Sequence, residues 1–144
     1  ELIMQKNPCS IIHLMNPNTL YNPTPFAYSH VAQIHVHQLS RIVHIAGQGG
    51  EQHDQTLSAD FASQLTQVMK NVQLALQAAD ATLYDIAMLR ILVCQYDQHT
   101  HQLIIQHLKA LWQEHALPAC TLIPVPCLAL PDMQIEIEAT AYCA

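Results

Sequence analysis

The sequence predicts an α+β domain in which two helices pack on one face of a β-sheet. Two segments carry apolar residues at helical spacing, and an apolar segment of strand length lies between them. Further strand patterns precede the first helix and follow the second, so the predicted element order is β-β-α-β-α-β-β. A chain of 144 residues is long enough to bury one hydrophobic core without a disulfide or a metal to stabilise it.

An irregular arm and a β-hairpin are predicted at the N-terminal end. Residues 1–27 contain several prolines and asparagines, as turns and loops do, so the domain itself is predicted to span residues 28–144. Residues 30–37 alternate between apolar and polar at period two, and residues 42–46 resemble a returning strand. The three glycines of the chain all lie within residues 47–50. Because glycine permits backbone conformations and close contacts that other residues do not, we expect the second strand to end there.

The first helix is predicted over residues 58–79. Apolar residues recur there at helical spacing, Ser58 is a suitable N-cap, and Asp60 suits the first turn. Asp80 tolerates a left-handed conformation better than most residues, so we expect it to end the helix.

The second half of the chain completes the predicted sheet. Residues 86–96 are mostly apolar and indicate a buried strand, and residues 100–115 indicate a second helix that ends before Pro118. Two final strands are predicted near residues 121–123 and 134–142.

Composition and charge exclude several classes of protein. Hydrophobic residues make up 51% of the chain and charged residues only 11%, against about 25% in a typical protein, so a disordered chain is excluded. The net charge of −6 and the lack of a basic stripe argue against a nucleic-acid partner. Prolines interrupt the long uncharged stretch near the C-terminus, and no run of about 18 apolar residues occurs, so no membrane span is predicted. No signal-peptide pattern is visible, and we therefore expect a cytoplasmic protein.

The cysteines predict neither a disulfide framework nor a zinc ribbon. Five cysteines are present, an odd number, and none of them form a CxxC pair. We expect free and mostly buried thiols, as for Cys94 within an apolar strand, and we expect no cofactor.

Several short segments together resemble one known family. Tyr28-Ser29-His30 resembles an early element of that family, and Ile45-Ala46-Gly47-Gln48 resembles the end of one of its strands. The helix over residues 61–80 with Asn71, the segment Pro118-Ala119-Cys120-Thr121 and the segment from Ile135 to Ala141 resemble its later elements. On these residues the chain is similar to the Rid family (reactive intermediate deaminase A, also called YjgF), some members of which are labelled L-PSP endoribonucleases.

The resemblance implies a fold, an assembly and an activity. The implied fold is chorismate-mutase-like, with one mixed β-sheet and two helices on one face. The implied assembly is a homotrimer in which three sheets form an inner barrel and ligand clefts lie between subunits. In the deaminating members, these clefts hydrolyse 2-imino acids to 2-keto acids and ammonia. An arginine after the Pro-Ala pair binds the substrate carboxylate, and the glutamate that corresponds to Glu136 lies near the attacking water.

The sequence departs from this pattern where the family binds the carboxylate. Cys120 follows Pro118-Ala119 in place of the arginine, and the usual asparagine of the second helix has no counterpart in Leu103-Ile104-Ile105. A missing charged hydrogen bond of about 1.5–3 kcal/mol would weaken binding of a carboxylate substrate strongly. We therefore do not expect efficient hydrolysis of 2-imino acids.

The candidate ligand-binding residues are Tyr28, Gly47, Gln48, Cys120 and Glu136, with Glu136 as the catalytic candidate. Each has a simpler interpretation as well: Tyr28 as an aromatic plug, Cys120 as a packed thiol and Glu136 as a strand residue facing solvent. Arg90 is a possible substitute anchor for an anion, although a structural hydrogen bond within the sheet is the simpler interpretation.

The histidines offer a hypothesis of metal binding. His35 and His37 share a strand face, and His44 would oppose His35 if the predicted hairpin forms, so that three imidazoles could bind zinc. No carboxylate nearby would orient these ligands, so we predict no metal site and favour an exposed or interface position.

The sequence thus predicts a Rid-like homotrimer that binds a small, mostly apolar or weakly polar metabolite between its subunits. Whether it is an enzyme is left open. The first alternative is an enamine or imine deaminase that acts on 2-imino acids, and the second is a non-catalytic module for sensing a ligand or binding a protein partner.

Overall fold

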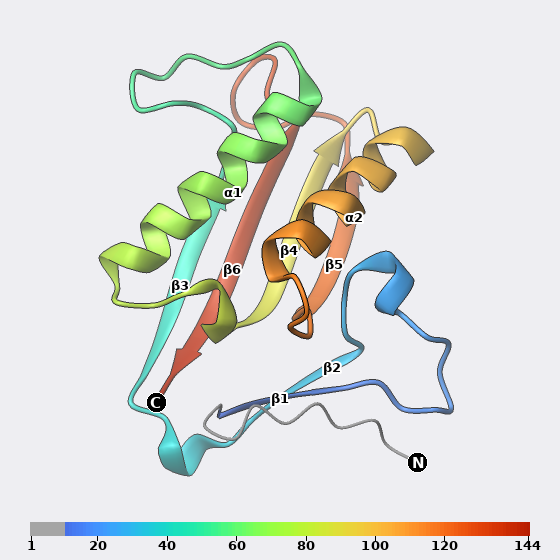
Figure 1. Cartoon of the computed structure of the whole chain (residues 1–144). Coiled ribbons are helices and arrows are strands. Elements are labelled where there is room, and N and C mark those ends of the chain that lie inside the picture. Colours follow the sequence, from blue (N-terminus) through green and yellow to red (C-terminus); the bar gives the residue numbers. More distant parts are fainter. Residues whose placement is uncertain (1–10) are drawn as a thin grey trace.

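A mixed four-stranded sheet lies at the centre of the computed structural model, which describes residues 11–144 (Figure 1). The strand order is β3-β6-β4-β5, where only β4 and β5 run parallel to each other. The strands are β3 (Arg41–Gln48), β4 (Ile86–Cys94), β5 (Ala119–Val125) and β6 (Ile135–Cys143). Helices α1 (Phe61–Ala78) and α2 (Gln98–Trp112) cover one face of this sheet (Figure 1). The predicted fold class, two helices packed on one face of a mixed sheet, is confirmed.

The first helix begins at an acidic cap. Asp60, two residues after the predicted cap Ser58, accepts hydrogen bonds from the backbone N–H of Ser63 at 2.8 Å and from its hydroxyl at 2.7 Å. The predicted stop at Asp80 is confirmed, since Asp80 adopts a positive φ of 50°. The helix therefore has the register that its apolar spacing predicted, and only its first turn differs.

The second helix is shifted towards the N-terminus relative to its prediction. A capping box between Asp97 and Thr100 begins α2 at Gln98. Gln113 then adopts a positive φ of 53° and ends the helix three residues before the predicted end at His115. Side chains of Ile104, Ile105 and Leu108 on α2 face the sheet and are buried.

The main core lies between the helices and the sheet. Alternate residues of β4 and β6, among them Leu89, Ile91, Ile135 and Ile137, are fully buried beneath the helices. The intervening residues of these strands point to the other side, which no helix formed by residues 11–144 covers. We call this side the open face; it carries Ile42, His44, Met88, Arg90, Leu92, Thr121, Ile123, Glu136, Glu138 and Thr140.

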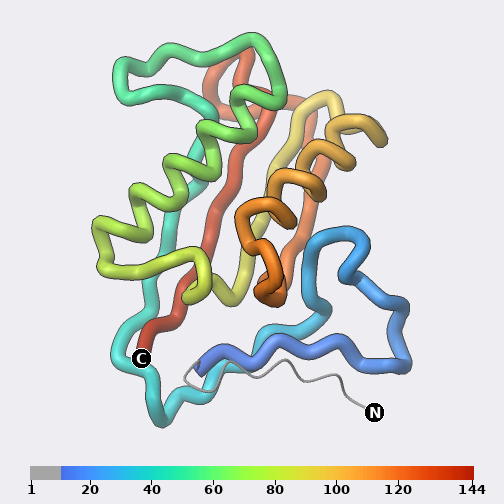
Figure 2. The backbone as a smooth tube through the Cα atoms, in the orientation of Figure 1, coloured from blue at the N-terminus to red at the C-terminus, as the bar shows by residue number. Residues whose placement is uncertain are grey.

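The predicted hairpin does not form. Strand β2 (Val31–Ile34) pairs instead with β1 (Ile12–Met15), and the two make a separate antiparallel sheet. A short 3-10 turn, Val36–Gln38, ends β2 and redirects the chain, so that β3 pairs with β6. Figure 2 shows the β1–β2 ribbon crossing the end of the main sheet, where it packs near Ala87 and Tyr142.

This pairing also corrects the predicted irregular arm over residues 1–27, because the arm contains β1. Its first ten residues, with Cys9, lie outside the described part of the chain. Within residues 11–144 the cysteines Cys94, Cys120, Cys127 and Cys143 are free thiols. None of the helices formed by these residues is both long and apolar enough to cross a membrane.

Candidate functional site

Tyr28 lies next to Cys120 at the start of β5, although 92 positions separate the two residues in the sequence. Ser29, which follows Tyr28, is 4% exposed and attaches this segment to β5. Its backbone N–H donates to the carbonyl of Pro118 at 3.0 Å, and its hydroxyl donates to the carbonyl of Leu117 at 2.6 Å. An isolated parallel bridge joins Ser29 to Ala119. These bonds fix the chain that carries Tyr28 next to the start of β5.

A pocket of about 570 Å³ opens beside these two residues, on the helix side of β5. We call it the Cys120 pocket. Most of its wall is apolar and comes from α2, β5, one residue of β4, and Tyr28 with the loop that precedes it. Its polar side chains are neutral or carry an imidazole, and no lysine, arginine or carboxylate among residues 11–144 lines it. The lining residues are Tyr21, Phe26, Ala27, Tyr28, Ile91, His101, Ile104, Ile105, Leu108, Cys120, Thr121 and Leu122.

The Cys120 thiol is protonated in this environment. Cys120 packs against the main core together with Leu122. Burial raises the pKa of the Cys120 thiol to about 12, because the thiolate would lose its hydration. A nucleophilic cysteine needs a lowered pKa, so the site does not activate Cys120 as a nucleophile.

The Tyr28 hydroxyl is hydrogen-bonded to the hydroxyl of Tyr21. Burial, followed by this hydrogen bond, raises the pKa of Tyr28 to about 12. Tyr28 therefore offers a neutral phenol to the pocket. The sequence analysis did not single out Tyr21, because nothing in the predicted irregular arm indicated that its side chain would reach Tyr28.

Gly47 and Glu136 form a second group, on β3 and β6. One extra residue of β3 bulges between Ile45 and Gln48. The carboxylate of Glu136 occupies the space that a Cβ atom at Gly47 would need. Glu136 makes no hydrogen bond or ion pair with any other residue between 11 and 144. Gln48, in contrast, donates its side-chain amide to the carbonyl of Ala46 at 2.9 Å.

A single chain does not bring the two groups together. Cys120 is paired with Leu89 and faces the helices, whereas Glu136 is paired with Leu92 and faces the open face. The five predicted ligand-binding residues thus divide into Tyr28 with Cys120 at one place and Gly47, Gln48 and Glu136 at another.

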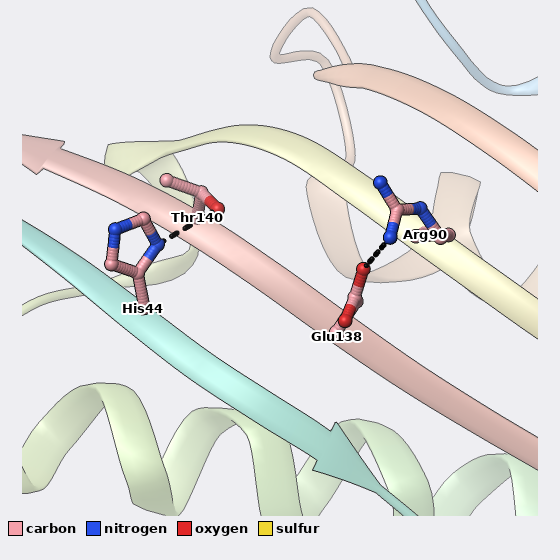
Figure 3. Close-up of polar contacts among 4 residues, drawn as sticks. All are labelled: His44, Arg90, Glu138 and Thr140. Atoms are coloured by element: carbon pink, nitrogen blue, oxygen red, sulfur yellow. Dashed lines mark hydrogen bonds and ion pairs between the residues drawn. The ribbon is translucent and has the colours of Figure 1, made fainter.

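Neither arginine lines the Cys120 pocket. Arg90 forms an ion pair with Glu138 at 2.6 Å on the open face, where the two side chains are 51% and 42% exposed (Figure 3). Arg41 donates to the carbonyl of Asp80 at 2.6 Å, at the end of α1. Within one chain Arg90 is thus paired with Glu138 across β4 and β6, as the simpler interpretation of a structural contact within the sheet predicts.

The histidines do not converge as the predicted hairpin required. The ring centroids of His35 and His37 lie 5.9 Å apart, and those of His35 and His13 lie 4.1 Å apart with the two planes tilted by 48°. His44 lies on β3 and contacts Thr140 at 3.4 Å (Figure 3). Because β2 does not pair with β3, the expectation that His44 opposes His35 is wrong. Residues 11–144 contain no group of three or more ligating side chains placed to hold a metal ion.

Comparisons with known proteins agree with this fold. The family profile described as Endoribonuclease L-PSP matches residues 23–143. The Rid-family protein YyfB of Yersinia pestis, whose function is unknown, is 32% identical with a TM-score of 0.86, over 93% of this chain and 100% of that one.

Two further solved structures are more distant. The YjgF gene product of Escherichia coli is 28% identical with a TM-score of 0.64, over 72% of this chain and 82% of its own. Rv2704 of Mycobacterium tuberculosis is 26% identical with a TM-score of 0.59, over 90% of this chain and 98% of its own. No curated relative matches the chain.

Proposed function

Since the chain belongs to the Rid family, the family of the endoribonuclease L-PSP profile, we propose that it is a homotrimer that binds a small, mostly apolar or weakly polar metabolite in clefts between its subunits. In this proposal efficient hydrolysis of 2-imino acids is not its function.

The apolar character of the Cys120 pocket carries the proposal. Cys120 lines this pocket at the position where the family resemblance implies an arginine, and Ile104 and Ile105, from the stretch that lacks the usual asparagine, line it as well. A carboxylate that entered it would lose its hydration without gaining a cation, which is strongly unfavourable. An uncharged ligand has no such cost.

The division of the candidate residues supports clefts between subunits. Gly47 and Glu136 lie on the open face side of one chain, away from Tyr28 and Cys120 of the same chain. One cleft that contains both groups therefore requires two copies of the chain. The open face also carries the apolar side chains Ile42, Leu92 and Ile123, which a second copy would remove from water.

Release of 2-keto acid from freshly generated 2-imino acids tests the proposal. We expect the rate to remain near the uncatalysed background. The substitution Cys120→Arg restores the missing cation and should raise the rate if the rest of the cleft is intact. Cys127→Arg is a matched control, because Cys127 is exposed and does not line the pocket. A wild-type rate far above background would overturn the proposal.

A second candidate function, hydrolysis of a neutral enamine or imine, is favoured by Glu136. Its carboxylate is free of any hydrogen bond or ion pair to the other described residues, so it is available to accept a proton from water. Glu136→Gln should abolish such an activity and leave ligand binding largely intact. Equal rates in the wild type and this variant would exclude Glu136 as the base.

The non-catalytic alternative uses the same clefts. A thermal-shift screen against uncharged metabolites tests it, because a ligand present at 100 times its Kd stabilises the folded protein by about 2.7 kcal/mol. Stabilisation by a metabolite that the protein does not convert would favour sensing. RNA cleavage is not proposed, since a net charge of −6 opposes binding to phosphates.

A further inference from the structure

The Tyr21–Tyr28 hydroxyl pair is the polar feature of the Cys120 pocket that the proposed function does not use. Tyr21 projects from the loop before Tyr28 and is 61% exposed. The edge of its ring contacts Phe26 and His30, with centroids 6.2 and 4.9 Å apart. Its hydroxyl reaches only Tyr28 among the described residues. Both tyrosines line the pocket.

A count of hydrogen atoms shows that the pair has one donor to spare. Each phenol carries one O–H hydrogen, and the bond between the two hydroxyls uses one of them. Neither hydroxyl has another partner within residues 11–144, so the second hydrogen is left without a protein acceptor at the pocket wall. A donor at the edge of an apolar pocket fixes the orientation of a ligand that carries an acceptor.

The charge of the site decides which acceptor is favoured. The Tyr28 phenol is neutral at physiological pH, since burial and the hydrogen bond to Tyr21 raise the pKa of Tyr28 to about 12. The described part of the chain places no lysine or arginine on the pocket wall, so an anionic acceptor would be left uncompensated there. A carbonyl oxygen of a ketone or aldehyde accepts a hydrogen bond without bringing a charge.

We propose that the Tyr21–Tyr28 pair selects ligands in which a neutral carbonyl oxygen is attached to an apolar group that fills the Cys120 pocket. The inference rests on the proposed function, because it requires that the pocket binds a small molecule. It adds the chemical class of the ligand and makes Tyr21 a specificity-determining residue.

Three probes of similar size separate the possibilities: acetophenone, ethylbenzene and benzoate. They share a phenyl ring and differ in carrying a neutral acceptor, no acceptor or an anionic acceptor. NMR titration of the full chain gives the Kd of each. We expect acetophenone to bind about 3- to 10-fold more tightly than ethylbenzene, the effect of one neutral hydrogen bond. Benzoate should bind more weakly than acetophenone.

The double variant Tyr21→Phe/Tyr28→Phe removes both hydroxyls and keeps both rings. The ratio of the Kd of ethylbenzene to the Kd of acetophenone should fall to one or below, while the Kd of ethylbenzene itself changes little. Each single variant leaves one hydroxyl and should retain part of the preference. Tyr84→Phe is a matched control, because Tyr84 is 45% exposed and does not line the pocket. Thermal unfolding verifies that each variant is folded.

The outcomes distinguish this inference from the proposed function. Equal binding of acetophenone and ethylbenzene, or an unchanged preference in the double variant, overturns the selective role of the tyrosines and leaves the pocket as a binding site. Tighter binding of benzoate overturns the neutral class of ligand. Failure of all three probes to bind overturns the pocket itself and this inference with it.

Discussion

The three glycines are surrounded by close packing, and none of them adopts a positive φ, so the space for a Cβ atom decides what a substitution would do. A Cβ at Gly50 would meet the backbone of Gln64 in α1, at 2.8 Å from its Cα and 3.0 Å from its carbonyl oxygen. A Cβ at Gly47 would meet only the side chain of Glu136. A helix backbone cannot move without disturbing the core, whereas a glutamate side chain can rotate.

The variants Gly50→Ala and Gly47→Ala should therefore behave differently. We expect Gly50→Ala to lower the free energy of unfolding by about 1–3 kcal/mol, as other overpacked sites do. Gly47→Ala should cost less stability but displace the carboxylate of Glu136, so its main effect should be on any activity that uses Glu136. Urea unfolding at one protein concentration measures the free energy of unfolding of both variants. A larger loss of stability in Gly47→Ala would contradict this assignment.

The candidate site itself was predicted from the sequence only in part. Cys120 could be singled out because it stands in a recognisable segment, and the structure places it at the pocket next to Tyr28. Tyr21 and the ion pair between Arg90 and Glu138 could not be predicted, because both depend on how distant segments pack. No local pattern specifies such contacts.

At the scale of elements, local capping decides where each helix begins. The carboxylate of Asp60 is bonded to Ser63, and these hydrogen bonds, from the hydroxyl first and then from the backbone N–H, lower the pKa of Asp60. Both hydrogen bonds are stronger when the carboxylate is ionised. The stabilisation of α1 by this cap therefore depends on pH.

The direction of the pH dependence follows from the lowered pKa. The cap stabilises the folded protein at pH values above the ordinary pKa of aspartate. Its contribution is lost as the pH falls through the lowered pKa that Asp60 has in the folded protein. Asp60→Ala should lower the melting temperature at pH 7, and the difference from the wild type should shrink in acid. Melting curves between pH 7 and pH 3 measure it. A constant difference over this range would show that the charge of Asp60 is unimportant.

The strands were harder to place than the helices. Helical spacing predicted α1 and α2 to within a few residues, because each helix makes its hydrogen bonds within its own segment. A strand makes them with another segment, and the pattern in residues 30–37 identified strand character without identifying the partner. The structure pairs β2 with β1 and β3 with β6, a strand about a hundred positions later in the chain.

At the scale of the whole molecule, the two faces of the sheet differ in what covers them. The helices bury one face, and the open face keeps Ile42 at 49% exposure and Ile123 at 37%. An ion pair, Arg90–Glu138, lies in the middle of the open face (Figure 3). The proposed trimer would cover this face with two further copies of the chain.

Substitution of one residue on each side of the main sheet tests the proposed trimer. Ile42→Asp places a charge on the open face, so it should dissociate the assembly, because an unpaired charge buried between subunits is strongly unfavourable. Leu74→Asp is the matched control, since Leu74 is similarly exposed at 53% but lies on α1, on the opposite side of the sheet. Sedimentation analysis should find three copies in the wild type and in Leu74→Asp, and smaller species in Ile42→Asp. A wild-type protein with one copy would contradict the assembly.

The sequence by itself determined the two helices, the buried strands between and after them, and the fold class, because apolar periodicity is a local property that matches a local geometry. The low content of charge and the cysteine after Pro118-Ala119 were likewise visible in the sequence alone. Only the tertiary structure decided that β2 leaves the main sheet, that Tyr21 joins Tyr28 at the Cys120 pocket, and that Arg90 is engaged by Glu138 on the far side of the sheet. Each of these depends on contacts between segments far apart in the chain, and such contacts are fixed by the packing of the whole domain and not by the pattern of any one segment.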